Sequence, residues 1–342
     1  MKLKDVCIKG TSNIRQKDVN DSGRYPVYGA AGPVGFMNSF QYDEPYVGVV
    51  KDGAGIGRAT YLPSNSSIIG TMQALIPKKN VLPKYLYYAV SSMHLEKYYS
   101  GATIPHIYFK NYKHERFVLV SKKEQEQIIW RFSLLEKMIS NKQQQLLKLD
   151  ELIKARFVEM FGDPIINNKN IKKKKLGDIC LLKAGDFIPS KKISPVKTSI
   201  NKYPCFGGNG IRGYVDNYTH QGNYSLIGRQ GALCGNVKFA TGKFRNTEHA
   251  ILVSPNIEIN SRWLFELLNL EKLNRFRSGA AQPGLAVKTL NEIIVPVADL
   301  NSQNEYANFV QQVDKSKFEN IVYLNKTLLN KILSQIGDVI RD

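Results

Sequence analysis

The chain has 342 residues, of which 43% are hydrophobic, and it carries a formal net charge of +19. This length is enough for two or three domains, and the apolar content predicts packed cores rather than disorder. No apolar run is long enough to cross a membrane and the N-terminus has no secretory pattern, so we expect a cytoplasmic protein with no membrane partner. The excess of positive charge favours a polyanionic partner, with nucleic acid first.

The four cysteines lie at positions 7, 180, 205 and 234. They form no C-x-x-C pair and do not cluster with the five histidines, so we expect no zinc or other metal site. Cys7 and Cys180 have apolar neighbours and are interpreted as small core residues of a reduced protein.

Residues 1–120 have the pattern of an irregular α/β domain. Short β-rich stretches at 46–50, 59–62 and 74–77 are broken by Gly, Pro, Asn and Ser, and residues 83–100 predict short helices. The Gly-rich stretch 52–59 resembles a nucleotide-binding loop. A strand-like stretch follows it, however, whereas a dinucleotide fingerprint opens a helix, so we interpret its glycines as turn residues.

A long helix is predicted next, within residues 121–164. No Gly or Pro occurs from 125 to 161, and apolar residues recur mostly every three or four positions. Such a helix would be roughly 50 Å long, with Gly162 and Pro164 marking its end. The predicted stripe consists of Ile128, Phe132, Leu135, Ile139, Leu146, Leu149 and Ile153.

The second half of the chain repeats the first. The segment "YPVYGAAGPVGF" at 25–36 matches "YPCFGGNGIRGY" at 203–214, an offset of 178 residues, and further Gly and Tyr landmarks agree at this offset. The pattern indicates tandem duplication of a large domain. We therefore expect a second domain at 165–300 and a second helix at 301–342, with the apolar stripe Val310, Val313, Ile321, Leu324, Leu328 and Ile332.

Two long striped helices in one chain most simply pack against each other as an antiparallel coiled coil. In the alternative arrangement, each helix folds back onto its own domain. The predicted fold class is α/β (α+β), with two tandem domains that are each followed by a long helix.

The charge lies on the globular parts. Residues 1–120 have a net charge of +7 and residues 165–300 of +11, whereas 121–164 and 301–342 have +1 and zero. The basic run 169–176 is interpreted chiefly as a solvated linker. Two basic domains suit two contacts on one nucleic acid, and the neutral helices suit spacing and protein partners.

Signatures of catalysis are missing. The chain has no Walker A loop, no H-E-x-x-H motif and no carboxylate two residues before a Lys. The "FGGNG" stretch at 206–210 fits a loose S-adenosylmethionine pattern, but its partner copy reads "YGAAG". One alternative is therefore a single-chain DNA methyltransferase, and another is a non-specific DNA-binding or antirestriction scaffold.

Three segments carry a family resemblance: "EQEQIIWRF" at 124–132, "KLDELIKARFVEMFGDP" at 148–164 and "SQNEYANFV" at 302–310. With the two Gly-rich domains, they resemble the specificity subunit of a type I restriction–modification system. After Leu328 the second helix departs from the motif of the first, although its apolar rhythm persists.

The resemblance implies that each domain is a target recognition domain reading one half of a split sequence in double-stranded DNA. It implies that the helices set the gap between the half-sites and dock two methyltransferase (modification) subunits, which restriction subunits join. It also implies a non-catalytic chain that binds no cofactor, because S-adenosylmethionine, ATP and Mg²⁺ belong to the partner subunits.

DNA contacts are expected from basic and amide or carboxylate side chains beside the repeated glycines. Lys51 and Arg229 share a repeat position and suit phosphate contact, whereas Asp52 and Gln230 share a position but differ, which suits base reading. The candidates are Lys51, Asp52, Arg58, Gln73, His106 and Lys110 in the first domain, and Asn209, Arg212, Arg229, Gln230, His249, Gln282 and Lys288 in the second.

Overall fold

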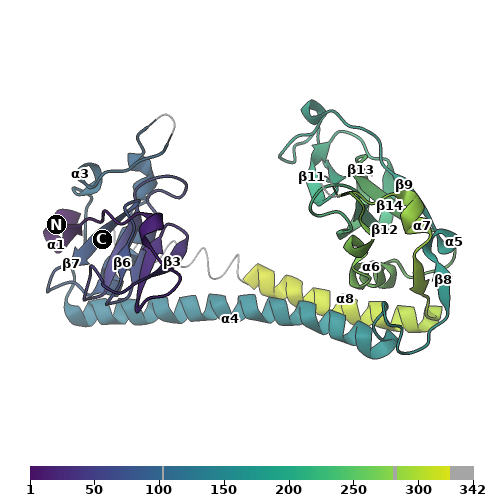
Figure 1. Cartoon of the computed structure of the whole chain (residues 1–342), viewed down its shortest axis with the longest axis horizontal. Helices are drawn as coiled ribbons and strands as arrows, with labels where there is room; N and C mark the ends of the chain where they lie inside the picture. The colour runs from purple at the N-terminus through teal and green to yellow at the C-terminus, as the bar shows by residue number, and fades with distance from the viewer. Residues whose placement is uncertain (102–103, 280–282, 324–342) are drawn as a thin grey trace. The chain divides into compact units, whose positions relative to one another are not determined.

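The computed structural model describes residues 1–101, 104–279 and 283–323 (Figure 1). The chain divides into two compact units, one built around residues 1–143 and the other around residues 144–320. The predicted residues Gln282, Leu324, Leu328 and Ile332 lie outside the described residues. No helix in the described ranges is both long and apolar enough to cross a membrane.

The first repeat folds into two small sheets with short helices. One sheet is antiparallel with the order β1-β7-β4-β5, and the other has the order β3-β2-β6. Strands β4 and β5 and part of β7 are the three strands predicted from sequence. The elements are α1 (Leu3–Val6), β1 (Cys7–Gly10), η1 (Gln16–Asp18), β2 (Tyr25–Gly29), β3 (Gly32–Met37), β4 (Tyr46–Val50), β5 (Ala59–Leu62), β6 (Ser67–Ile68), β7 (Met72–Pro77), α2 (Pro83–Ser91), η2 (Leu95–Tyr98) and α3 (Phe109–Tyr112).

The second repeat follows the same order of elements, with two added short strands, β8 and β15, and with β13 in place of β5 and β6. Its main sheet has six strands in the order β11-β10-β13-β12-β14-β9, and a small sheet pairs β15 with β8. The elements are β8 (Lys173–Lys175), α5 (Leu176–Ile179), β9 (Cys180–Ala184), η3 (Ser190–Lys192), β10 (Tyr203–Gly207), β11 (Gly210–Val215), β12 (His220–Gly228), β13 (Val237–Asn246), β14 (Ala250–Pro255), α6 (Ser261–Leu270), η4 (Leu273–Phe276), α7 (Val287–Asn291) and β15 (Ile294–Pro296).

The duplication predicted from sequence is confirmed in the pairing of the strands. The parallel pair Val27↔Ser67 of the first repeat recurs as Cys205↔Arg245 in the second, again at an offset of 178. A β-bulge follows Val27 in one hairpin and Cys205 in the other. The sheet counts differ because β13 is one continuous strand where the first repeat has separate β5 and β6.

A glycine in each repeat lets one loop pack closely against a short 3-10 helix. The loop after β4 approaches η2 in the first repeat, and the loop after β12 approaches η4 in the second. Gly57 and Gly235 have φ of +83° and +84°. A Cβ atom at Gly57 would lie 2.5 Å from the backbone nitrogen of Glu96, and one at Gly235 would lie 2.4 Å from that of Asn274. Only glycine fits such a backbone contact at positive φ, which explains why these glycines recur.

Helix α4 (Lys122–Phe161) begins at a capping box and ends at a glycine, close to the predicted bounds. The backbone N–H of Ser121 donates to the Glu124 carboxylate at 2.9 Å, and the N–H of Glu124 donates to the Ser121 hydroxyl at 3.3 Å. At the other end Gly162 has φ of +75°, and its N–H donates to the carbonyl of Val158 at 2.8 Å.

The first half of α4 covers the core of the first repeat, which corrects part of the seam prediction. Ile128 and Phe132 are buried in that core, where the Phe132 ring lies 4.8 Å from the Tyr88 ring of α2, and Leu135 packs against the same cluster. The alternative of a helix folded onto its own domain therefore holds here, because α2 presents an apolar face to the stripe.

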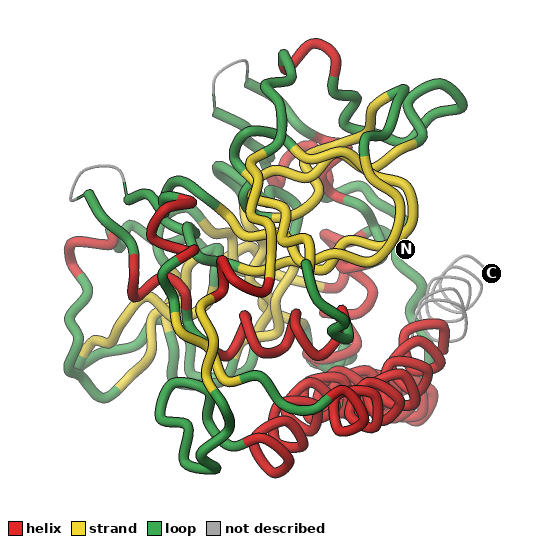
Figure 2. The backbone as a smooth tube through the Cα atoms, turned by 90° about the vertical axis from the view of Figure 1, so that its right-hand side faces the viewer, coloured by secondary structure: helices red, strands yellow, loops and turns green. Residues whose placement is uncertain are grey.

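The last third of α4 pairs with α8 (Leu300–Tyr323) in an antiparallel arrangement. Arg156 lies 3.0 Å from Glu305, and Asp150 lies 2.6 Å from Lys317. The later residue of α4 therefore pairs with the earlier residue of α8, as two antiparallel helices require. The two helices run side by side in both views of the chain (Figures 1 and 2). The prediction of antiparallel pairing is thus confirmed within residues 144–320.

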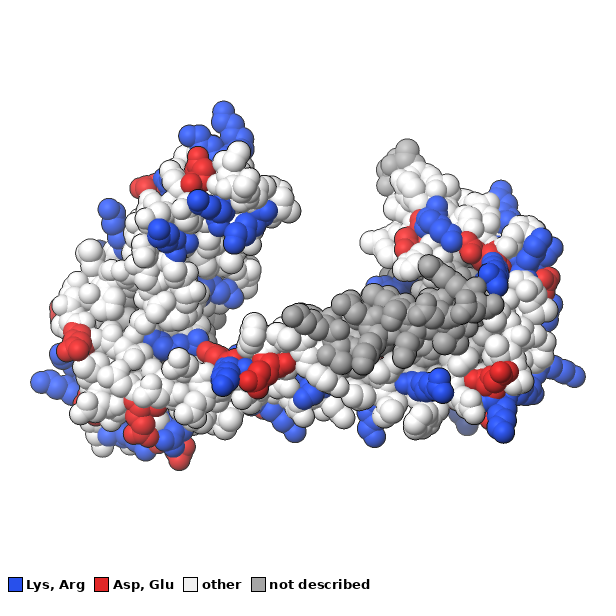
Figure 3. Space-filling view, turned by 180° about the vertical axis from the view of Figure 1, so that it is seen from behind, with Lys and Arg blue, Asp and Glu red and all other residues white. Residues whose placement is uncertain are grey.

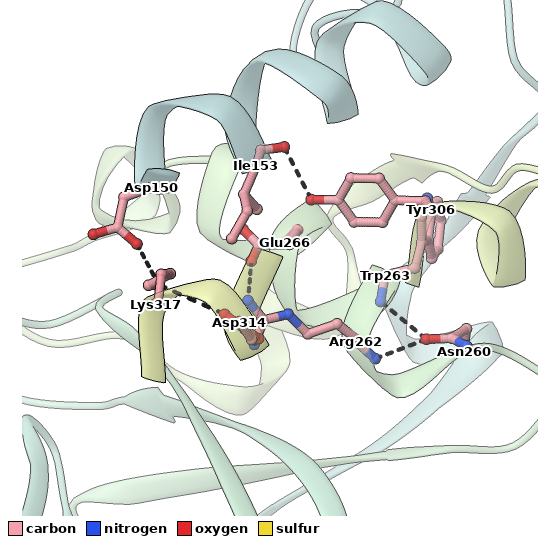
Figure 4. Close-up of polar contacts among 9 residues, drawn as sticks. All are labelled: Asp150, Ile153, Asn260, Arg262, Trp263, Glu266, Tyr306, Asp314 and Lys317. Carbon is pink, nitrogen blue, oxygen red and sulfur yellow. Dashed lines mark hydrogen bonds and ion pairs between the residues drawn. The ribbon is translucent and has the colours of Figure 1, made fainter. Parts of the chain in front are cut away.

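An aromatic and aliphatic core holds these two helices to α6. Phe157 lies 5.4 Å from Tyr306 and 6.2 Å from Trp263 between ring centroids, and the Tyr306 hydroxyl donates to the carbonyl of Ile153 at 3.2 Å (Figure 4). The predicted seam residues that join this cluster are Leu149, Ile153, Val310 and Val313. Of the other predicted seam residues, Ile139 and Leu146 are half-buried and Ile321 is 43% exposed.

A charged network ties α6 to α8 beside this core. Arg262 of α6 lies 3.0 Å from Glu266 and 3.4 Å from Asp314 of α8 (Figure 4). Burial raises the pKa of Glu266, and the neighbouring Arg262 opposes that rise. Arg262 thus pairs with one carboxylate on its own helix and with one on α8.

Candidate nucleic-acid interface

The loop after β4 carries three predicted contact residues on a backbone that is held on both sides. Lys51 N–H donates to the carbonyl of Thr71 at 3.0 Å, and Gly53 N–H donates to that of Pro105 at 2.9 Å. The carbonyl of Lys51 accepts from Ile107 N–H at 2.9 Å. Gly53 has φ of +84°, which turns the chain away after position 52.

The loop after β12 repeats these three hydrogen bonds. Arg229 N–H donates to the carbonyl of His249 at 2.9 Å, and Gly231 N–H donates to that of Pro283 at 2.9 Å. The carbonyl of Arg229 accepts from Leu285 N–H at 2.8 Å, and Gly231 has φ of +82°. Equivalent positions in the two repeats therefore present their side chains from the same backbone.

In the second repeat, four predicted residues line one open groove of about 620 Å³: Asn209, Arg212, Gln230 and His249. The turn between β10 and β11 forms one wall and the loop after β12 forms the other. Asn209 Oδ1 accepts from Asn236 Nδ2 at 2.8 Å, which braces that turn. Sequence positions 40 residues apart thus converge on one surface.

In the first repeat, the equivalent loop is tied together by charged side chains. His106 Nδ1 lies 2.7 Å from Asp52 Oδ1, and Lys51 Nζ lies 4.0 Å from the other carboxylate oxygen. Arg58, in the position equivalent to Asn236, donates to the carbonyl of Ala30 in the β2–β3 turn. The structure therefore brings Lys51, Asp52, Arg58 and His106 to one loop cluster.

Three other predicted residues, Gln73, Lys110 and Lys288, lie outside these two groups. Gln73 is 5% exposed, and its side-chain amide donates to the carbonyls of Gly10 and Ala74. We therefore withdraw Gln73 as a DNA contact, because β7 turns it into the domain. Lys110 and Lys288 are exposed at equivalent positions on α3 and α7.

A second basic surface was not foreseen from the sequence. The loop 186–202 carries Lys191 and Lys192, which border a cavity of about 410 Å³ together with Asn217 and Arg245. Arg245 Nη1 donates to Asn217 Oδ1 at 2.7 Å. Figure 3 shows Lys and Arg side chains gathered at this end of the second repeat. The sequence holds one signal for this surface, which is that the loop is five residues longer than its counterpart in the first repeat.

The stretch that suggested an S-adenosylmethionine pattern lies in a β-hairpin that borders the groove. The "FGGNG" stretch is the hairpin connection between β10 and β11, with a strand on both sides and no helix after it. Burial raises the pKa of the Cys7 and Cys180 thiols to about 12, so neither is a thiolate nucleophile at neutral pH. Within the described ranges, no group of three His, Cys, Asp or Glu side chains is arranged to hold a metal ion.

The fold defined by these repeats and helices is that of type I restriction–modification S subunits. The S subunit from M. genitalium is 18% identical with a TM-score of 0.61, and the alignment covers 100% of this chain and 96% of that one. A chain from a study of assembly and conformational transition of the type I R-M system is 15% identical with a TM-score of 0.58. That alignment covers 98% of this chain and 96% of the other.

The family model for the type I restriction modification DNA specificity domain matches residues 1–151 and 168–333, one copy in each repeat, and the chain belongs to this family. The EcoprrI specificity subunit of Escherichia coli is 46% identical over 143 residues, 42% of this chain and 36% of that protein. The MjaVIII specificity subunit of Methanocaldococcus jannaschii is 22% identical over 330 residues, which cover 83% of this chain and 77% of that protein. The match thus spans about a third of the Escherichia coli relative's length.

Proposed function

We propose that this chain is the DNA-specificity subunit of a type I restriction–modification complex, and that each repeat reads one half of a split duplex sequence. The pair of equivalent loops at 51–53 and 229–231 carries the proposal. Their backbones make matching hydrogen bonds, whereas the side chains they present differ. One scaffold with two sets of polar side chains suits two different half-sites.

The helices would set the gap between the half-sites and dock two modification subunits. The antiparallel pairing of α4 and α8 within residues 144–320 supports a defined spacer. Duplication supports two identical partners, because it supplies two equivalent surfaces on one chain. In this proposal the chain acts in the cytoplasm and is not itself catalytic. The partners carry S-adenosylmethionine, ATP and Mg²⁺, and restriction subunits complete the nuclease.

Methylome sequencing of the host tests this proposal directly. We expect one split motif to lose methylation when the gene is deleted and to regain it on complementation, because the partner methyltransferase then lacks its reader. An unchanged methylome would contradict the proposal. A single-chain methyltransferase would instead bind S-adenosylmethionine as the isolated chain, and a non-specific scaffold would show no sequence preference in competition binding.

A further inference from the structure

Positions 52 and 230 are the same structural position with different hydrogen-bonding chemistry. Both follow a basic residue and precede a glycine at positive φ, and both form isolated β-bridges, Asp52 with His106 and Gln230 with Gly284. A Cβ atom at the glycine after either position would meet nothing within 4 Å, so each loop borders open space at that glycine.

Asp52 presents one carboxylate oxygen that is fixed and one that is accessible. An ionised carboxylate only accepts hydrogen bonds, so His106 Nδ1 donates to Asp52 Oδ1 across 2.7 Å. The second oxygen lies 4.0 Å from the Lys51 ammonium group, and the Asp52 side chain is 27% exposed. An acceptor held in this way fits a base edge that offers a donor, which in the major groove is the N4 amino group of cytosine.

Gln230 presents a donor and an acceptor together. It is exposed in the groove beside Asn209, Arg212 and His249, and its amide makes no hydrogen bond to another residue that the structure describes. A free carboxamide matches the N6 donor and N7 acceptor of adenine in a bidentate contact. The two repeats therefore offer different partners to a base pair at the same place on the scaffold.

We propose that 52 and 230 are equivalent base-reading positions, at which Asp52 reads the cytosine of a C·G pair in one half-site and Gln230 reads the adenine of an A·T pair in the other. His106 is a positioning residue that holds the Asp52 carboxylate. The inference rests on the proposed function and adds which residue reads which base in each half-site.

A reciprocal pair of isosteric variants tests the inference. Asp52→Asn keeps an oxygen for His106 but converts the free oxygen into an amino donor, and Gln230→Glu makes the opposite change. The full chain, co-expressed with its host's modification subunits, selects from a pool of random duplexes that is then sequenced. We expect Asp52→Asn to shift one position from C towards bases whose major-groove edge offers an acceptor, and Gln230→Glu to shift one position of the other half-site from A towards C, each by roughly tenfold.

The control is Lys288→Ala, which should lower affinity without changing any preferred base. If the variants bind and select the same bases as the wild type, the inference is overturned while the proposed function stands. The same holds if the wild-type half-sites lack the C·G or the A·T pair. If the wild-type complex selects no sequence at all, the proposed function fails and the inference fails with it.

Discussion

Single residues in this chain divide into those that shape the repeated backbone and those that vary on it. Gly53, Gly57 and their counterparts 178 positions later keep the same positive φ in both repeats. The side chains between and beside them differ, as at Asp52 and Gln230. The glycines conserve a loop geometry within one molecule, and the neighbouring positions are free to take new recognition chemistry.

Alanine at Gly57 should destabilise the first repeat more than alanine at Gly53. Both positions have positive φ, but only at Gly57 would the Cβ atom meet backbone, 2.5 Å from Glu96 N. We expect about 1 kcal/mol for Gly53→Ala and roughly 3 kcal/mol for Gly57→Ala in the free energy of unfolding. Urea denaturation of both variants measures this, and equal losses would contradict the role assigned to the contact.

At the scale of elements, each long helix is anchored to its repeat by the same buried glutamine. Gln125 Oε1 accepts from Leu82 N–H at 2.8 Å, and Gln303 Oε1 accepts from Asn260 N–H at 2.8 Å. Both side chains are almost fully buried, with exposures of 0% and 1%. The amide joins the start of the long helix to the start of the helix that packs on the sheet, so the duplication includes the domain–helix junction.

Replacing Gln303 with alanine should weaken this junction. In the wild type, Gln303 Oε1 accepts from the Asn260 N–H, and Gln303 Nε2 donates to the Ala298 carbonyl at 2.8 Å. The variant leaves both backbone groups without these partners. A buried polar group without a partner costs about 1–3 kcal/mol, and we expect a loss in that range in the free energy of unfolding. Gln145→Ala, at an exposed site on α4, is the control and should change stability little. If both variants unfold alike, the glutamine is not an anchor.

At the scale of the whole molecule, the charge follows the duplication. Both repeats are basic and both long helices are near neutral, so +18 of the chain's +19 belongs to the parts that carry the candidate DNA contacts. Arg229 and Lys288 each have a basic counterpart in the first repeat, Lys51 and Lys110. Basic residues at equivalent positions of both repeats suit contact with DNA phosphates, because the phosphate backbone does not depend on the base sequence.

Removing a shared basic side chain should weaken binding to all duplexes by a similar factor. For Arg229→Ala we expect a loss of about 1–3 kcal/mol for the cognate duplex. For Lys288→Ala we expect a uniform loss, and the slope of log affinity against log salt should fall by about one. Titrations of the assembled complex at several salt concentrations measure both. A loss confined to one sequence would instead indicate base contact.

Much of this architecture is readable from the sequence because it depends on local chemistry. The tandem repeat follows from spaced glycines, and the end of α4 follows from Gly162, since a helix stops where the chain takes positive φ. The four groove residues Asn209, Arg212, Gln230 and His249 are candidates from the sequence because they flank the repeated glycines, and the structure places them around one groove.

The tertiary structure alone decided which face of each element is covered. A stripe of apolar residues is equally suited to a partner helix or to its own domain, and only the position of α2 sends Ile128 and Phe132 into the first repeat. Gln73 has the chemistry of a base-reading residue, but β7 turns it inward to the carbonyls of Gly10 and Ala74. Local pattern determines which elements form, whereas the non-local packing of those elements determines which side chains remain free to meet DNA.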